Sequence, residues 1–302
     1  MNDLILYQYD ISPFSEKIRR MLGYAGLLWR AVEVRPMPPR PALDILAGGY
    51  RKIPVAQIGA DVFCDTQSIA RHIARTTGHA ALDIQACSAE ARAFAARTDL
   101  DVFLAFIIGA GPGLLVGLAR HTSVLDTLRF VMDRAAIARK ARVKTMTPGQ
   151  ARKIVAAHVR DMEARLDNAF LFGDTPCAAD FSAFHSLWFS REMTRQDWQR
   201  DAPRVGAWFD RMTAFGTGTH TFIDAETALD VARDAEPRAL GDSALAQPRR
   251  VRIAPADYAR DPVSGWLVAQ DEASWTLRRE HARVGTVHLH LPRQGYELTP
   301  AD

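Results

Sequence analysis

The sequence predicts an N-terminal α/β domain, then an all-helical domain, then a small β-rich extension. Three observations support this order. The first 75 or so residues alternate strand and helix patterns, residues 86–235 show only helical periodicity, and residues 236–302 alternate apolar and polar side chains between turns. The expected boundaries are therefore 1–78, 86–235 and 236–302, with a small polar linker between the first two domains.

The N-terminal domain is expected to contain four strands and three helices. Phe14, Ile18 and Met21 recur at the spacing of one helix face, and Gly59-Ala60 is a hairpin signal between two short apolar runs. In chain order the expected elements are strand Leu4–Tyr9, helix Pro13–Ala25, strand Trp29–Val34, a short helix near Ala42–Ala47, strands Pro54–Ile58 and Asp61–Cys64, and helix Gln67–Ala74. The order β-α-β-α-β-β-α is that of a thioredoxin-like domain, in which the first two strands lie side by side in parallel.

The second domain shows helical patterns throughout. Thr147 followed by Pro148 predicts a helix N-cap with proline at the first helical position. The expected helices include Ala89–Ile108, Val124–Ala141, Pro148–Leu171, Ala179–Trp188 and Val205–Phe215.

The extension is expected to form a small sheet or barrel. Its apolar face, which includes Trp266 and Trp275, must pack somewhere, and we expect it to dock on the helical domain or on a second subunit. Two imidazoles, His288 and His290, share one face of a strand and predict either a solvent-facing pair or a metal site completed by a third ligand such as His281. The expected strands are Arg249–Ile253, Trp266–Ala269, Trp275–Arg278, Thr286–Leu291 and Tyr296–Leu298.

Composition is that of an ordinary globular protein, with 48% hydrophobic and 24% charged residues in 302. The net charge of +3 is too small to make nucleic acid or an anionic membrane the expected partner. Cys64, Cys87 and Cys177 form neither a disulfide framework nor a C-x-x-C zinc pattern, so no metal is expected. The apolar stretch Val102–Leu118 is interrupted by glycines and a proline, and the N-terminus lacks a secretory pattern. We therefore expect a protein of the reducing cytoplasm.

The segment Ile11–Arg19 joins the first strand to the first helix, where a thioredoxin-like fold places a reactive thiol. Both positions of the C-x-x-C frame are serine here, Ser12 and Ser15, so any sulfur chemistry must come from a bound thiol. The helix N-terminus would favour its anion. Ser12 also suits an N-cap before Pro13, and the two interpretations are compatible.

Two further segments carry candidate binding residues. In Lys52-Ile53-Pro54 a proline entering a strand suggests a cis peptide that exposes backbone groups to a peptide ligand, and Lys52 could hold a carboxylate or be a surface lysine. Asp65 and Thr66 begin a helix, where they could cap it or bind an ammonium and a carboxylate of a ligand.

Together, S-P-F-S-x-K-x-R, then K-I-P-V about 35 residues later, then an acidic residue and threonine at a helix start resemble the glutathione S-transferase superfamily. The resemblance covers roughly residues 3–235 and is nearest to serine-type and to omega- or tau-like members. The turn Phe172–Phe181 also resembles the family's buried helix start, which implies a structural role for Asp180.

The resemblance implies specific roles. Ser12 would donate a hydrogen bond to the glutathione sulfur. The backbone of Ile53, before a cis Pro54, would pair with the cysteinyl unit, and Lys52 would face the glycine carboxylate. Asp65 and Thr66 would bind the γ-glutamyl end.

The implied function is that of a glutathione transferase, with glutathione as co-substrate and an apolar electrophile as the second reactant, acting in detoxification as a homodimer. The alternative is a non-catalytic glutathione- or ligand-binding scaffold protein. Ser15, Tyr7 or Tyr9 could replace Ser12 as the activating group. The candidate wall for the electrophile is formed by Phe103, Phe106 and Ile107, although apolar residues at this spacing are more often core.

Overall fold

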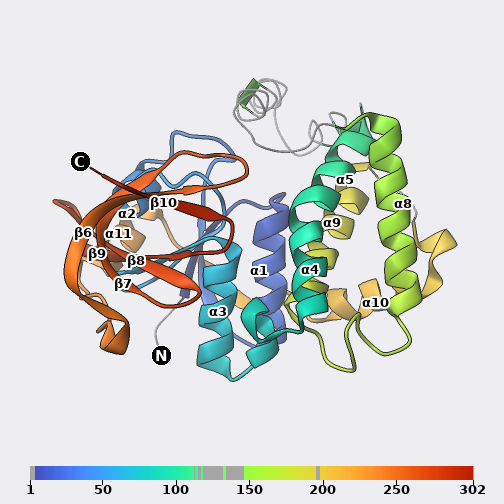
Figure 1. The fold of residues 1–302 in the computed structure, drawn as a ribbon, viewed down its shortest axis with the longest axis horizontal. Helices are drawn as coiled ribbons and strands as arrows, with labels where there is room; N and C mark the ends of the chain where they lie inside the picture. Colours follow the sequence, from blue (N-terminus) through green and yellow to red (C-terminus); the bar gives the residue numbers. More distant parts are fainter. Residues whose placement is uncertain are drawn as a thin grey trace.

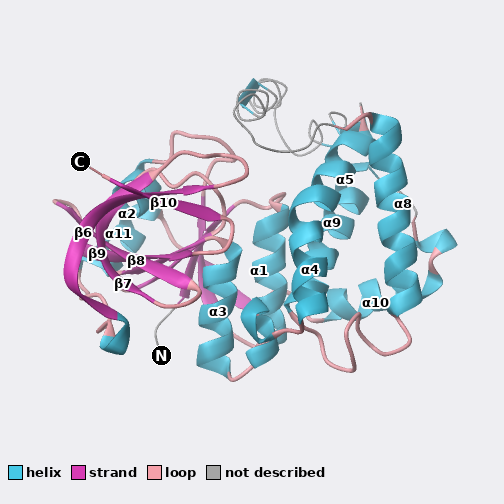
Figure 2. Ribbon diagram, in the orientation of Figure 1, coloured by secondary structure: helices cyan, strands magenta, loops and turns pink. Residues whose placement is uncertain are grey.

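The computed structural model describes residues 4–111, 113–114, 117, 132–133, 146–194 and 198–301. In these parts a mixed sheet forms one side of the molecule and a group of helices forms the other (Figures 1 and 2). The strand order across the sheet is β10-β6-β7-β8-β9-β4-β3-β1-β2-β5. The strands are β1 (Leu4–Gln8), β2 (Leu28–Glu33), β3 (Val55–Ile58), β4 (Asp61–Cys64), β5 (Thr219–Phe222), β6 (Ala244–Pro255), β7 (Val263–Gln270), β8 (Ser274–His281), β9 (Gly285–Pro292) and β10 (Tyr296–Pro300).

The helices lie between and beside these strands. Helices α1 and α3 stand between the sheet and the helical part in Figure 1. A π-helical turn, Thr98–Val102, joins α4 to α5. The helices are α1 (Pro13–Tyr24), α2 (Pro41–Ala47), α3 (Thr66–Thr77), α4 (Ala89–Arg97), α5 (Phe103–Ala110), α8 (Pro148–Arg165), α9 (Ala178–Thr194), α10 (Pro203–Ala214) and α11 (Ala225–Arg233).

The predicted thioredoxin-like order of the first domain is confirmed. Strand β1 pairs in parallel with β2 and antiparallel with β3, and β3 pairs with β4 across the Gly59-Ala60 hairpin. The predicted N-cap is also confirmed, because the Ser12 side chain accepts a hydrogen bond from the Ser15 backbone N–H and Pro13 follows it. Each predicted strand and helix of this domain is present within a few residues of its expected ends.

The helical domain agrees with the sequence pattern except at one segment. Thr147 forms a full capping box with Gln150 at the start of α8. The expectation of only helices between 86 and 235 is wrong at β5, which pairs in parallel with β2 at the edge of the sheet. The predicted helix Val124–Ala141 lies outside the described residues apart from 132–133.

The extension contains the five predicted strands, and its expected docking on the helical domain is confirmed in part: its apolar side chains pack on α11, but also on α2 and the N-terminal strands. Strand β9 pairs in parallel with β4 and so continues the N-terminal sheet, with Val62 opposite Leu289. The alternating pattern specified the strands, but it could not specify which distant strand edge they would join. The extension is therefore part of the same sheet as the first domain.

This pairing also changes the expectation for the two histidines of β9. His288 is buried, and the Nε2 atom of His290 lies 2.7 Å from a carboxylate oxygen of Asp61. The His290 ring stacks on Phe63 with 4.6 Å between centroids. A solvent-facing pair is therefore wrong. Within the described residues, no group of three or more histidine, cysteine or acidic side chains is placed to hold a metal.

Two apolar cores lie on opposite faces of the sheet. One joins α1 and α3 to the helical domain, with Trp208 and Phe181 among its fully buried side chains. The other joins α2 and α11 to both the N-terminal strands and the extension, with Leu43, Val62 and Leu289 fully buried. The strands of the extension curve around α2 and α11 (Figure 1). None of the described helices is long and apolar enough to cross a membrane.

The first core contains a histidine that should make stability depend on pH. His158 is 2% exposed, neither ring nitrogen has a partner among the described residues, and the ring stacks on Phe94. Burial, with a smaller contribution from Arg97, lowers the pKa of His158 to about 4. Between pH 4 and 6.5 the unfolded chain therefore binds more protons than the folded chain, and stability rises with pH. We expect this residue to remove about 3 kcal/mol of unfolding free energy as the pH falls from 7 to 4.

Urea unfolding at a series of pH values checks this expectation. His158→Phe should flatten the pH dependence of stability in that window. Part of the dependence should remain, because burial also lowers the pKa of His72 to about 4. The exposed His281 provides the matched control, since His281→Phe should leave the slope unchanged. An unaltered slope in His158→Phe would contradict the assignment.

Candidate functional site

A pocket of about 400 Å³ lies where α1, α3, the α4 helix and two loops of the extension meet. One part of its wall is apolar, formed by Phe14, Met21, Leu82 and Leu100. The other part is polar and includes the predicted binding residues Lys52, Ile53, Pro54, Asp65 and Thr66. The structure therefore brings all three candidate segments to one cavity, the first of them through Phe14 and Lys17.

Ser12 heads the helix that forms one wall of the pocket. Its side chain is 1% exposed, and its oxygen accepts the Ser15 backbone N–H at 3.2 Å. Phe14 and Lys17, which follow it on α1, line the pocket. Ser15 is fully buried, and its hydroxyl has no partner among the described residues. The capping role of Ser12 is thus confirmed, and its contact with a ligand sulfur stays a prediction.

The Ile53–Pro54 peptide bond is cis, as the sequence predicted. It precedes β3, whose first residue, Val55, pairs with Tyr7 of β1. Tyr7 itself is fully buried, and its hydroxyl donates to Gln57 at 2.7 Å. Burial raises the pKa of Tyr7 far above its ordinary value. Tyr7 is therefore a core residue and does not reach the pocket as an alternative activating group.

Asp65 caps α3 and also contacts the extension. One carboxylate oxygen accepts the Gln67 backbone N–H at 3.0 Å, which confirms the predicted cap. The other oxygen accepts the Tyr296 hydroxyl at 2.8 Å, and that hydroxyl lies 2.6 Å from the hydroxyl of Tyr50. Asp65 has a backbone φ of +75°, a conformation that non-glycine residues rarely adopt. The start of α3 is thus held against the last strand of the chain.

The opposite wall carries a buried polar cluster that the sequence analysis did not identify. The Lys17 ammonium lies 2.8 Å from a carboxylate oxygen of Asp99 and 2.9 Å from the Ser182 hydroxyl. The second oxygen of Asp99 lies 3.0 Å from Nε2 of His185, which is fully buried. Asp99 sits in the π-helical turn between α4 and α5. The cluster therefore joins α1 to the helical domain.

The charges of this cluster are balanced internally. Burial alone would raise the pKa of the Asp99 carboxyl, but Lys17 and the His185 hydrogen bond hold it well below its ordinary value. Burial lowers the pKa of His185, so this ring is neutral at pH 7 and its Nε2–H donates to Asp99. Spacing in sequence could not reveal the cluster, because its members lie on three separate helical segments.

Lys52 has its counter-ion from the extension. Its ammonium lies 3.0 Å from a carboxylate oxygen of Asp257 and 4.4 Å from the centre of the Tyr258 ring. The loop that bears both residues, together with the turn at Gln294-Gly295, completes the wall of the pocket. The extension is therefore part of the candidate site.

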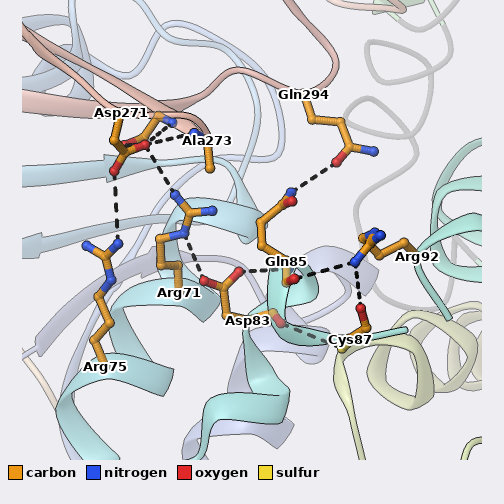
Figure 3. A network of polar contacts seen from close by, with 10 residues as sticks. Arg71, Arg75, Asp83, Gln85, Cys87, Arg92, Asp271, Ala273 and Gln294 are labelled. Carbon is orange, nitrogen blue, oxygen red and sulfur yellow. Dashed lines mark hydrogen bonds and ion pairs between the residues drawn. The ribbon is translucent and has the colours of Figure 1, made fainter. Parts of the chain in front are cut away.

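A polar network holds the extension to α3 and to the linker (Figure 3). Asp271 lies 3.8 Å from Arg71 of α3, which donates to Asp83 of the linker at 3.0 Å. The Gln85 amide donates to the Gln294 side chain at 3.2 Å. These contacts fix the Gln294 turn beside the pocket and connect it to the start of the helical domain.

The candidate wall residues for an electrophile lie elsewhere than in this pocket. Phe103 and Ile107 pack in an apolar cluster with Phe189, and Phe103 also contacts Phe14 edge-on at 5.1 Å. Phe106 borders a separate groove of about 880 Å³ along α8. Their role as a substrate wall remains a prediction.

Comparisons with known proteins agree on one family. Residues 6–80 match the family described as "Glutathione S-transferase, N-terminal domain", and residues 130–211 match "Glutathione S-transferase, C-terminal domain". A search of curated proteins gave no match. A solved structure of a GST-like protein from Pseudomonas syringae is 30% identical, covers 100% of both chains and superposes with a TM-score of 0.74. The match therefore includes the extension.

Two other solved structures are more distant and match a smaller share of the chain. A glutathione S-transferase from Sinorhizobium meliloti 1021 is 20% identical, with 70% of this chain and 88% of that chain covered and a TM-score of 0.46. FzlA from C. crescentus is 20% identical with the same coverage and a TM-score of 0.49.

Proposed function

The chain belongs to the glutathione S-transferase superfamily, and we propose that it binds glutathione in the pocket between α1, α3 and the extension and holds the sulfur as a thiolate that attacks an apolar electrophile. The observation that supports this most directly is that Lys52, Ile53 and Pro54 share one cavity with Asp65 and Thr66. A homodimer that acts in detoxification in the cytoplasm is the further expectation from the family.

Each polar group of the ligand would have a partner of suitable chemistry. The backbone of Ile53 would pair with the cysteinyl unit in the manner of an added strand. The Asp65 carboxylate would accept from the γ-glutamyl ammonium, and the Thr66 hydroxyl and N–H at the start of α3 would donate to its carboxylate. Lys52 would face the glycine carboxylate of the ligand.

Activation of the thiol would come from the start of α1. A free cysteine thiol has a pKa of about 8.5, so only a few per cent is thiolate at pH 7. A hydroxyl donor and a helix N-terminus both favour the anion. Ser12 already accepts the Ser15 N–H, and its own O–H proton is the one it would donate to the sulfur. The apolar wall near Phe14, Leu82 and Leu100, with the predicted wall residue Phe103 edge-on against Phe14, would receive the electrophile.

The alternative is a binding protein without turnover on the same scaffold. Two observations favour it: the Ser12 side chain is nearly inaccessible, and Lys52 already has a counter-ion in Asp257. Both functions require glutathione to bind, and they differ in whether the bound thiol is ionised at neutral pH. Thiolate absorbance therefore separates them.

Ser12→Ala is expected to keep glutathione affinity within about threefold while raising the pKa of the bound thiol by roughly one to two units, because one hydroxyl donor to the anion is lost. Calorimetry measures the affinity, and ultraviolet absorbance across pH measures the thiolate. Loss of the N-cap should cost about 1 kcal/mol, which leaves the variant folded.

Ser15→Ala is the matched control, since Ser15 is a buried serine of the same helix turn. It should leave the thiol pKa unchanged. If Ser15→Ala shifts the pKa and Ser12→Ala does not, the activating group is Ser15. Binding of glutathione with an ordinary thiol pKa in the wild type would support the binding protein, and no binding at all would contradict both functions.

A further inference from the structure

Two cysteines that lie far apart in the sequence meet at the boundary between the linker and the helical domain. Cys87 follows the 3-10 turn Ile84–Ala86, and Cys177 directly precedes α9. The Cys177 thiol donates a hydrogen bond to the Cys87 sulfur. Both residues belong to the first core, where Cys87 is 9% and Cys177 8% exposed. The fold therefore builds a pair of neighbouring thiols that the sequence spacing does not reveal.

The surroundings of Cys87 favour its thiolate. Its sulfur lies at the N-terminus of α9, where the Ala178 backbone N–H donates to it. The hydrogen bonds from Cys177 and Ala178 hold the pKa of Cys87 below its ordinary value, although burial and the charges of Asp83 and Asp180 oppose them. A thiolate at a helix N-terminus is the nucleophilic form of cysteine.

The surroundings of Cys177 have the opposite effect. Its hydrogen bond to Cys87, burial and the charge of Asp180 raise the pKa of Cys177, so it keeps its proton. Its backbone N–H donates to Asp180 at 3.0 Å, which fixes its position at the start of α9. One sulfur that ionises readily beside a second that remains a thiol is the arrangement of an attacking and a resolving cysteine.

The Cys87 backbone is also held in place. Its N–H donates to the Ile84 carbonyl oxygen at 3.2 Å, and its own carbonyl oxygen accepts the Arg92 guanidinium at 2.7 Å (Figure 3). Ile84, Arg92 and Ala178 all line the candidate pocket. A covalent bond between the two sulfurs would thus tie two parts of the pocket wall together.

We propose that Cys87 and Cys177 form a redox site, which a hydroperoxide oxidises to a disulfide and a small thiol such as glutathione reduces. The Cys87 thiolate attacks a peroxide oxygen and the O–O bond breaks. Cys87 becomes a sulfenic acid, and the leaving oxygen takes a proton from solvent to give water or an alcohol. The Cys177 sulfur then attacks the sulfenic sulfur, so that the S–S bond forms and the hydroxyl leaves with the Cys177 proton as water.

The cycle is closed by thiol–disulfide exchange. One small thiol attacks the disulfide and a second releases the protein dithiol, so the two electrons that the peroxide removed are returned and the small thiol leaves as its own disulfide. This inference does not rest on glutathione binding in the pocket, so it can fail or stand independently of the proposed function.

The test treats the folded wild type with hydrogen peroxide at pH 7, blocks the remaining thiols by alkylation and maps the peptides by mass spectrometry. The expected product, in most molecules, is a link between Cys87 and Cys177 within one chain that glutathione removes. Cys177→Ser keeps a hydroxyl donor at the start of α9. It should lose the link and leave Cys87 as a sulfenic acid that dimedone traps.

Cys64→Ser is the matched control. Cys64 is fully buried in the second core, on the opposite face of the sheet, and burial raises its pKa. The link should form in this variant as in the wild type.

Three results would overturn the inference. The first is that Cys87 and Cys177 both remain reduced in the peroxide-treated wild type. The second is a link that involves Cys64 or joins two chains. The third is a link that forms only after unfolding in urea. The peptide map of the wild type decides the question even if Cys177→Ser does not fold.

Discussion

A chain that ends at residue 235 is expected not to fold stably. The second core contains side chains from both sides of this point, such as Val62 and Leu43 on one side and Leu289 and Val251 on the other. Burying one such side chain stabilises a protein by about 1.5–3 kcal/mol. If four side chains of the remaining chain lose their cover, the loss is roughly 6–12 kcal/mol, comparable with the entire stability of a typical domain. The truncated chain would also leave the edge of β4 unpaired.

Expression of residues 1–235 followed by circular dichroism and size-exclusion chromatography checks this expectation. The full-length variant Leu289→Ala tests the same packing with a smaller change. We expect it to lower the unfolding free energy in urea by about 3 kcal/mol, since Leu289 is fully buried. A soluble, cooperatively unfolding fragment 1–235 would show that the extension is an independent unit, contrary to the continuous sheet.

Asp180→Ala is expected to lower the unfolding free energy by about 4 kcal/mol. The carboxylate is fully buried and accepts three hydrogen bonds, from the Leu171 N–H at 2.9 Å, the Cys177 N–H at 3.0 Å and the Trp208 indole N–H at 3.0 Å. Hydrogen bonds to a charged group contribute about 1.5–3 kcal/mol each, and alanine leaves three buried donors without an acceptor. Burial raises the pKa of Asp180, so the cost of burying the carboxylate offsets part of the stability that these hydrogen bonds contribute in the wild type.

Urea unfolding followed by tryptophan fluorescence at pH 7 measures the effect. Asp180→Asn keeps one acceptor oxygen and should cost about 2 kcal/mol. The control is Asp174→Ala in the preceding exposed turn, which should change stability by less than about 0.5 kcal/mol. If the unfolding free energy of Asp180→Ala lies within 1 kcal/mol of the wild-type value, the three hydrogen bonds to Asp180 do not contribute the expected stability.

The parts that the sequence could predict are those set by local chemistry. The Ser12–Pro13 cap, the Gly59-Ala60 hairpin and the Thr147 capping box each depend on neighbouring residues, and each is present as expected. Asp180 could be assigned a structural role because its turn resembles a known helix start.

The parts that the sequence could not predict depend on pairs far apart in the chain. Strand β5 is only four residues long, and no regular alternation of apolar and polar side chains marks it as a strand. Its formation depends on pairing with β2. The contact of Lys52 with Asp257 joins positions 205 residues apart, and that of Lys17 with Asp99 joins positions 82 apart. Such long-range contacts produce no periodic pattern of apolar and polar residues in the sequence. Both of them lie in the candidate site.

The pairing of β4 with β9 has a consequence for the order of folding. The contact between Asp61 and His290 spans 229 residues, so two strands far apart in the chain must meet before the sheet is complete. At about 5–20 residues per second, a ribosome needs roughly 10–45 s to add that length. During this interval the edge of β4 that pairs with β9 has no partner strand from its own chain, so nascent chains of this protein are exposed to wrong pairing until β9 has been synthesised.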